Sequence, residues 1–174
     1  MPKPKWIKSN KDSFYDSNTD TIYSPDSIGE FYLHELFHAR PDTILLNELK
    51  PYYENLDDNK LSNMGANLEF VKRTDPNHFY QPEELGARVA VARKILKDVD
   101  INEEFLNNLR KNENKYGDNV RDLLKMFNNK NLIQILNMKK QLISKNQLGG
   151  PIARLAQPTN NKGSWGNRGQ GKEL

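Results

Sequence analysis

Two of the three histidines of this 174-residue chain stand four positions apart, in the stretch FYLHELFHAR at residues 31–40. On an α-helix, residues at i and i+4 lie one turn apart on the same face, so His34 and His38 can reach one ion if this stretch is helical. Glu35 then lies about 100° round the helix from His34, beside such an ion. The H-E-x-x-H pattern therefore predicts a helix carrying two metal ligands and a general base. The alternative is a helix whose partly buried histidines are satisfied by hydrogen bonds.

The two faces of the expected helix differ in polarity. At about 100° per residue, the two histidines and the glutamate fall on one side together with Phe31, while Leu33 and Leu36 fall mostly on the other. Such a helix is expected to bury its apolar back and to keep its polar front accessible.

A short hairpin is expected before this helix. Two β-prone pieces of DSFYDSNTDTIYSP flank the turn-rich DSNTD, which predicts a pair of antiparallel strands. Ser27 followed by Glu30 is a capping-box pattern, and Pro41 prevents continuation. The helix is therefore expected over residues 27–40.

Helices dominate the rest of the expected structure. Asp42 is placed to cap a helix over TILLNELK, which Pro51 ends, and Pro82 is placed to begin another that continues to about residue 97. Residues 51–81 are expected to be mostly irregular, with one short helix. Further helices are expected near residues 102–115, 118–127 and 131–144. The fold class is therefore α+β and predominantly helical, with a small N-terminal hairpin or sheet beside the histidine helix and a helical C-terminal half.

Charge and composition divide the chain into three parts. The net charge is +3, and four lysines within the first eleven residues make residues 1–12 a basic N-terminal arm. Residues 13–148 are long enough for one domain with its own core. From LGGP onward Gly, Asn, Gln and Pro dominate, so residues 149–174 are expected to form a flexible tail. Short lysine-bearing ends are usually only solvated, and the domain has no basic stripe, which argues against a nucleic-acid partner.

The absence of certain features excludes several classes of protein. The chain has no cysteine, so any metal must be held by His, Asp or Glu. No apolar run approaches the roughly eighteen residues of a membrane span. The N-terminal MPKPKWIKSN lacks the apolar stretch of a secretory signal. The expected location is therefore the cytoplasm, or a virion if the chain is phage-encoded.

A short strand followed by an H-E-x-x-H helix with an apolar back resembles the active-site region of the zincin metallopeptidases. The resemblance covers about residues 14–97, and only the pentapeptide is a tight match. It implies one zinc ion held by His34 and His38, with Glu35 as general base. It also implies that the strand TDTIY pairs with extended substrate.

Catalytic zinc takes three protein ligands, so a third must be found. The metzincin subgroup is excluded, because Pro41 and Ile44 replace the glycine and the histidine or aspartate that its pattern requires. The gluzincins, and related small phage and mobile-element proteases, take their third ligand from a glutamate on a separate downstream helix, often in an E-[IL]-x-A-R setting. The stretch ELGAR at residues 84–88 resembles that setting.

Helical periodicity chooses between the two adjacent glutamates of PEELGARVAVARKIL. Glu84 falls at the edge of the apolar arc of this helix, whereas Glu83 falls with Lys94 on the solvent side. Glu84 is therefore the predicted third ligand, and its alternative role is to complement the helix dipole. Gly86 is expected to mark a close approach to the histidine helix.

Other polar residues are candidates for supporting roles. Asp42 and His78 are the other candidates for third ligand, although a helix cap and a surface turn are their simpler roles. Arg88 lies inside the apolar arc, so it is expected to pair with Glu84 or another buried acid, unless it extends to solvent. The sequence does not rank the candidates for oxyanion stabiliser, which are Arg88, His78, Tyr80, Tyr52 and Tyr53.

Two functions follow from these residues. The first is zinc-dependent hydrolysis of a peptide or protein substrate, with Glu35 as general base. The second is a non-catalytic zincin-like component of a phage virion or mobile element, which binds a virion or other protein partner through its C-terminal helices or tail. An intact Glu35 favours the first, because a purely structural site has no use for a base.

Overall fold

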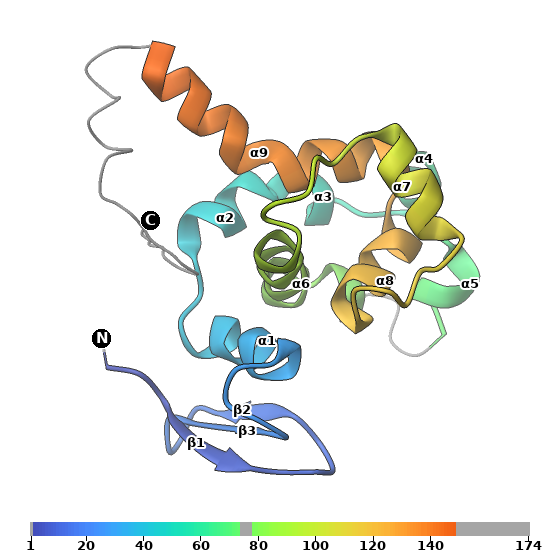
Figure 1. Ribbon diagram of the computed structural model, residues 1–174. Helices are drawn as coiled ribbons and strands as arrows, with labels where there is room; N and C mark the ends of the chain where they lie inside the picture. Colours follow the sequence, from blue (N-terminus) through green and yellow to red (C-terminus); the bar gives the residue numbers. More distant parts are fainter. Residues whose placement is uncertain (1, 74–77, 149–174) are drawn as a thin grey trace.

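Three short strands at the N-terminal end form a small sheet, and helices make up the rest of the computed structural model (Figure 1), which describes residues 2–73 and 78–148. The fold is thus α+β and predominantly helical, which confirms the expected class. The tail expected at residues 149–174 lies outside the described residues. No described helix combines the length and the apolar character that crossing a membrane requires.

The sheet contains the expected hairpin and one additional strand. Its strands are β1 (Lys5–Lys8), β2 (Phe14–Asp16) and β3 (Thr21–Ser24), in the order β1-β3-β2. β2 pairs antiparallel with β3, as expected, whereas β1 pairs parallel with β3. Residues 1–12 were expected to be a basic arm outside the domain, and this boundary needs correction, because β1 belongs to the sheet.

Helix α1 (Glu30–Ala39) packs between the sheet and helix α6 (Pro82–Ile95), as Figure 1 shows. The predicted capping box does not form. The N-cap residue is Gly29, and no side chain caps the helix. Asp26 instead accepts hydrogen bonds from the backbone N–H groups of Ile28 and Gly29. The carboxylate of Glu30 is directed to a different helix, described below.

The segment between α1 and α6 is more helical than expected. Asp42 caps α2 by accepting from the N–H groups of Ile44 and Leu45, as the sequence predicted. Pro51 does not end the helical region, because it lies in the first turn of the next short helix. The elements of this segment are α2 (Thr43–Glu48), α3 (Lys50–Tyr53), α4 (Asp58–Asn63), α5 (Leu68–Val71) and the 3₁₀ turn η1 (His78–Tyr80).

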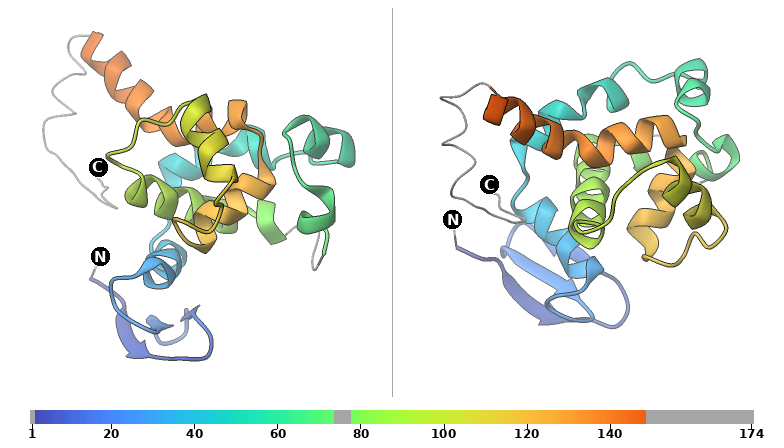
Figure 2. Two further views of the ribbon diagram at one scale, coloured as in Figure 1. Left: turned by 45° about the vertical axis from the view of Figure 1, so that its right-hand side comes forward. Right: turned by 45° about the horizontal axis from the view of Figure 1, so that its top comes forward.

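Helix α6 lies at the centre of the helical part. Every residue from Leu85 to Ala92 is buried. It contacts α1 on one side and two of the C-terminal helices, α8 and α9, on others, as the views of Figures 1 and 2 agree. The C-terminal helices are α7 (Glu103–Arg110), α8 (Asp118–Met126) and α9 (Asn129–Leu148). The expected helices of the C-terminal half are therefore confirmed, with shifts of a few residues at their ends.

Candidate metal centre

The close approach of α1 to α6 positions the predicted ligands. Gly86 makes this approach, because a Cβ atom added there would lie 2.7 Å from the ring of Phe37 and 2.8 Å from Leu46. Phe37 is itself 2% exposed, so its ring is held between the two helices. The sequence had predicted this role for Gly86. The histidine face of α1 consequently lies against the first turn of α6.

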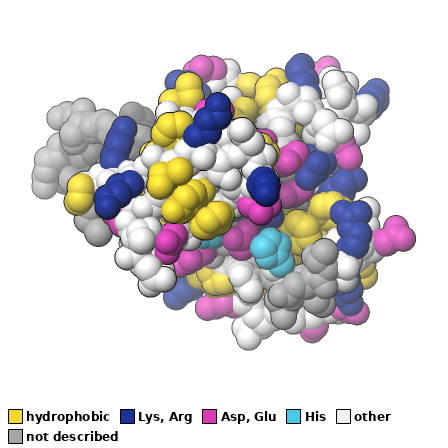
Figure 3. Space-filling view, turned by 90° about the horizontal axis from the view of Figure 1, so that it is seen from below, with side chains coloured by type: hydrophobic (Ala, Val, Ile, Leu, Met, Phe, Trp, Pro, Cys, Tyr) yellow, Lys and Arg dark blue, Asp and Glu magenta, His cyan; other side chains and the backbone are white. Residues whose placement is uncertain are grey.

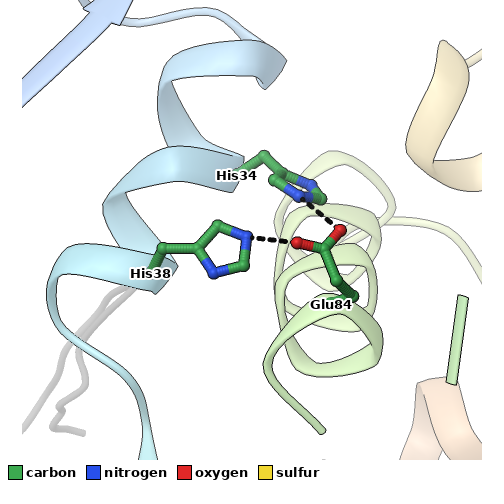
Figure 4. A group of neighbouring side chains, drawn as sticks. All are labelled: His34, His38 and Glu84. Carbon is green, nitrogen blue, oxygen red and sulfur yellow. Dashed lines mark ion pairs between the residues drawn. The ribbon is translucent and has the colours of Figure 1, made fainter. Parts of the chain in front are cut away.

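His34, His38 and Glu84 point toward one another across this junction (Figure 4). The Nε2 atom of His38 lies 2.8 Å from Oε2 of Glu84, and Nε2 of His34 lies 3.4 Å from Oε1. One nitrogen from each ring and one carboxylate oxygen all lie within 4.8 Å of one another. The three side chains are only 14–17% exposed.

This set of donors fits zinc. Two neutral imidazole nitrogens and one carboxylate oxygen are a recurring ligand set of catalytic zinc, which keeps its fourth position open. The donors come from two helices and meet at a shared point, so one ion can be held without rearranging the backbone. The described residues contain no other group of three such side chains with this spacing. The geometry agrees with the predicted ligand set, and the role in metal binding stays a prediction.

Electrostatic interactions within the group change the pKa values of Glu84 and His38. Burial opposes the charged form of Glu84, but hydrogen bonds and charges from His34 and His38 outweigh it and hold the Glu84 pKa well below its usual range. Burial likewise disfavours protonated His38, yet the hydrogen bond and the charge of Glu84 raise the His38 pKa. The hydrogen bond between His38 and Glu84 therefore links α1 to α6 at this point.

Glu35 is half-buried on α1, between the two histidines. Burial raises its pKa, and the charge of Glu84 raises it further, while the charges of His34 and His38 and a hydrogen bond with the Tyr15 backbone oppose the rise. A carboxyl group with a raised pKa is a better proton acceptor than an ordinary surface glutamate. The contact with Tyr15 also ties Glu35 to strand β2.

Arg88 pairs with the carboxylates of Glu84 and Asp122. Its Nη1 atom donates to Oε1 of Glu84 at 3.1 Å, and its Nε atom donates to Asp122 at 3.1 Å. Arg88 is 6% exposed, so it does not extend to solvent. Arg88 was expected to pair with Glu84 or with another buried acid, and in the structure it pairs with Glu84 and with Asp122.

His78 is the one further histidine, and it lies beside the cluster. Its Nε2 atom is 3.5 Å from Oε1 of Glu84, and its side chain is 45% exposed. Glu83 is 57% exposed, as predicted, although one of its oxygens lies 3.7 Å from Nδ1 of His38. In the space-filling view (Figure 3), histidine side chains reach the surface with acidic side chains around them.

Several candidates prove to have structural roles. The hydroxyl of Tyr80 is buried and donates to the carbonyl of Met126 at 2.8 Å, and burial raises the Tyr80 pKa. Tyr53 donates to the carbonyl of Leu46, and Tyr52 is buried against an aromatic ring of the core. The structure thus gives the hydroxyls of Tyr80 and Tyr53 backbone partners away from the cluster, and it gives no support to these tyrosines as oxyanion stabilisers. Asp42, a candidate ligand, is the cap of α2.

Helix α8 supplies neighbours that the sequence did not indicate. Oδ1 of Asn119 lies 2.7 Å from Nδ1 of His34, and Asp122 pairs with Arg88. Glu30 of α1 in turn accepts from Asn119. The only available signal was that Asn119 and Asp122 stand among apolar residues of an otherwise buried helix face, where a polar side chain needs a partner. The identity of that partner cannot be read from such a pattern.

Comparisons with protein-family models, with curated proteins and with solved structures gave no match to this chain. A proposal for the function must therefore rest on the chemistry and geometry of the side chains.

Proposed function

We propose that the protein is a zinc-dependent peptidase. The observation that carries this proposal is the half-buried Glu35 beside a group of two imidazoles and a carboxylate that converge from α1 and α6. His34, His38 and Glu84 would hold the ion through Nε2, Nε2 and the carboxylate. Bound zinc supplies Lewis-acid polarisation of a water molecule and of a carbonyl oxygen.

The side chains of this chain have distinct parts in that reaction. Glu35 takes the proton of the attacking water and passes it to the amine that leaves when the C–N bond breaks. Arg88 orients the carboxylate of Glu84, because it donates to one of its oxygens. His78, half-exposed beside Glu84, is the remaining candidate to stabilise the charge that develops on the carbonyl oxygen.

A non-catalytic binding protein, such as a virion or mobile-element component, is the second candidate. It is favoured by large apolar side chains that are exposed on the sheet and just before α1, among them Ile7, Phe14 and Ile28. A partner was expected at the C-terminal helices or the tail. Among residues 98–138, for which side-chain exposure is described, no large apolar side chain is exposed. For this alternative, the exposed apolar side chains of the N-terminal part are a second candidate docking surface beside the expected C-terminal one.

The test compares the zinc-loaded parent with Glu35→Gln on a complex mixture of peptides, with cleavage products identified by mass spectrometry. The amide preserves the shape of the side chain and removes its basic oxygen. Zinc content should stay the same, while turnover should fall by at least about a hundredfold, as is typical when a general base is lost. Glu104→Gln removes the same charge from an exposed position of α7 and should behave as the parent does.

Each function predicts a different outcome. Cleavage by the parent at an unchanged rate in Glu35→Gln would contradict the assignment of the base. Zinc binding without any cleavage by the parent would favour the binding protein.

A further inference from the structure

Asn119 bridges Glu30 and the ligand His34. Its Nδ2 atom donates to Oε2 of Glu30 at 3.0 Å, and its Oδ1 atom lies 2.7 Å from Nδ1 of His34. Asn119 is 5% exposed, so water does not compete for these contacts. The three side chains form a chain of hydrogen bonds that ends at a predicted metal ligand.

Glu30 determines which way the amide of Asn119 faces. The backbone N–H of Asp118 donates to one oxygen of Glu30 at 2.9 Å, and the backbone N–H of Asn119 lies 3.4 Å from the other. A carboxylate surrounded by donors accepts only. The NH₂ group of Asn119 must therefore face Glu30, and its oxygen must face His34.

The orientation of the amide fixes the tautomer of His34. An amide oxygen can only accept, so Nδ1 of His34 must carry a proton to make the 2.7 Å contact. In a neutral imidazole the other nitrogen, Nε2, then carries the lone pair. Nε2 is the atom that lies 3.4 Å from Glu84 and faces the proposed zinc position.

We propose that Asn119 and Glu30 are positioning residues that set the Nδ1–H tautomer of His34 and so present its Nε2 atom to the metal. This inference rests on the zinc site proposed above and adds two residues to it. A ligand histidine that is oriented in this way binds its metal more tightly, because no tautomer change or ring rotation is needed on binding.

The backbone around Asn119 is shaped for this contact. Gly117 has a φ of +92°, a conformation that favours glycine, and a Cβ atom there would lie 2.6 Å from both oxygens of Glu30. The missing side chain lets the carboxylate of Glu30 reach the first N–H groups of α8. Helix α8 is also held to α6, through the pair between Asp122 and Arg88. Helix α8 therefore touches both helices that carry proposed ligands.

The experiment measures zinc affinity of the full-length chain by competition with a chelator. Asn119→Leu removes the acceptor for His34 and should weaken zinc binding by about 10–100-fold. Glu30→Gln introduces a donor beside the amide of Asn119, and Asn119→Asp places two carboxylates against each other. Each of these changes should weaken zinc binding by a similar factor.

The double variant Glu30→Gln with Asn119→Asp is the decisive case. The introduced amide can donate to the introduced carboxylate, whose second oxygen can still accept from Nδ1–H of His34. The double variant keeps the net charge of the parent and should restore most of the zinc affinity.

Asp118→Asn is the matched control. It removes one negative charge at the start of α8 from a side chain that pairs with Arg121, and it leaves the amide of Asn119 in place. Its zinc affinity should match that of the parent. Nitrogen NMR of the zinc-loaded parent should show Nδ1 of His34 protonated and Nε2 bound to the metal.

Three results would overturn the proposal: zinc bound through Nδ1, a double variant no better than its single variants, or an equal loss in Asp118→Asn. Together with the cleavage assay proposed above, these data separate the positioning role from the peptidase proposal. The expected pattern of zinc affinities without any peptide cleavage would leave the positioning role standing and contradict the peptidase. A parent chain that binds no zinc would overturn both.

Discussion

Helices α1 and α6 face each other across the candidate site, but they are embedded in the protein to very different degrees. Helix α6 is buried continuously from Leu85 to Ala92, whereas only Tyr32 and Phe37 of α1 are buried. α6 thus forms part of the core and provides a fixed position for Glu84. α1, which packs between the sheet and α6 and is mostly half-buried, brings two histidines to that position. The difference suggests that changes in α6 affect both stability and metal binding, whereas changes on the polar face of α1 affect mainly metal binding.

The largest effect on stability is expected at the crossing of the two helices. In Gly86→Ala the new methyl group would lie 2.7 Å from the ring of Phe37, which is closer than Cβ atoms approach other heavy atoms in proteins. Overpacking of this kind lowers the free energy of unfolding by about 1–3 kcal/mol. The better helix propensity of alanine offsets at most about 1 kcal/mol of that loss. Denaturant unfolding would measure the net loss, and zinc affinity should fall with it because α1 is pushed away from α6.

A double-mutant cycle provides the control for this prediction. Phe37→Leu makes room for the methyl group, so the double variant should be more stable than the sum of the two single changes predicts, by at least about 0.5 kcal/mol. Simple additivity would show that the two helices do not meet at Gly86 as described.

The sequence predicted α1 and α6 well for physical reasons. Both the spacing of His34 and His38 and the placement of Glu84 follow from helical periodicity, which is a local property. Gly86 is a poor residue for a helix interior, so a close approach was the natural explanation. The structure agrees with each of these local inferences.

Features that depend on distant parts of the chain could not be predicted. Glu30 matched a capping box for its own helix, but it accepts hydrogen bonds at the start of α8, 88 residues away. The KWIK stretch carries two lysines and was assigned to a basic arm, yet it pairs parallel with β3. The contact of Asn119 with His34 spans 85 residues. No local pattern encodes which partner a buried polar side chain will meet.

A smaller effect is expected from pH in the metal-free protein. The folded state raises the His38 pKa, so the stability from His38 is fully present below its unfolded pKa of about 6.5 and is lost as pH rises through the raised value. The Glu84 pKa is lowered, so the stability from Glu84 is present above about 4.3 and is lost as pH falls. The metal-free protein should therefore be most stable between these two values.

In the presence of zinc, stability should instead increase as the pH rises above neutral, because zinc binding requires neutral imidazoles. The rise in unfolding temperature on adding zinc should therefore grow from about pH 6 to pH 8, which thermal unfolding with and without zinc would measure. In His78→Gln, which changes the half-exposed histidine, the zinc-induced rise in unfolding temperature should increase with pH nearly as it does in the parent. A zinc effect that is independent of pH would contradict the role of the two histidines of α1.

The most direct test of the central claim compares zinc affinity in Glu84→Ala and Glu83→Ala by chelator competition, with zinc counted by native mass spectrometry. Both changes remove one negative charge from the same turn of α6. Glu84 is 17% exposed and bonds His38, whereas Glu83 is 57% exposed. We predict that the parent binds one zinc ion, that Glu84→Ala weakens binding by at least about a hundredfold, and that Glu83→Ala weakens it by less than about threefold. Equal losses in the two variants, or unchanged zinc binding in Glu84→Ala, would contradict the proposed metal centre.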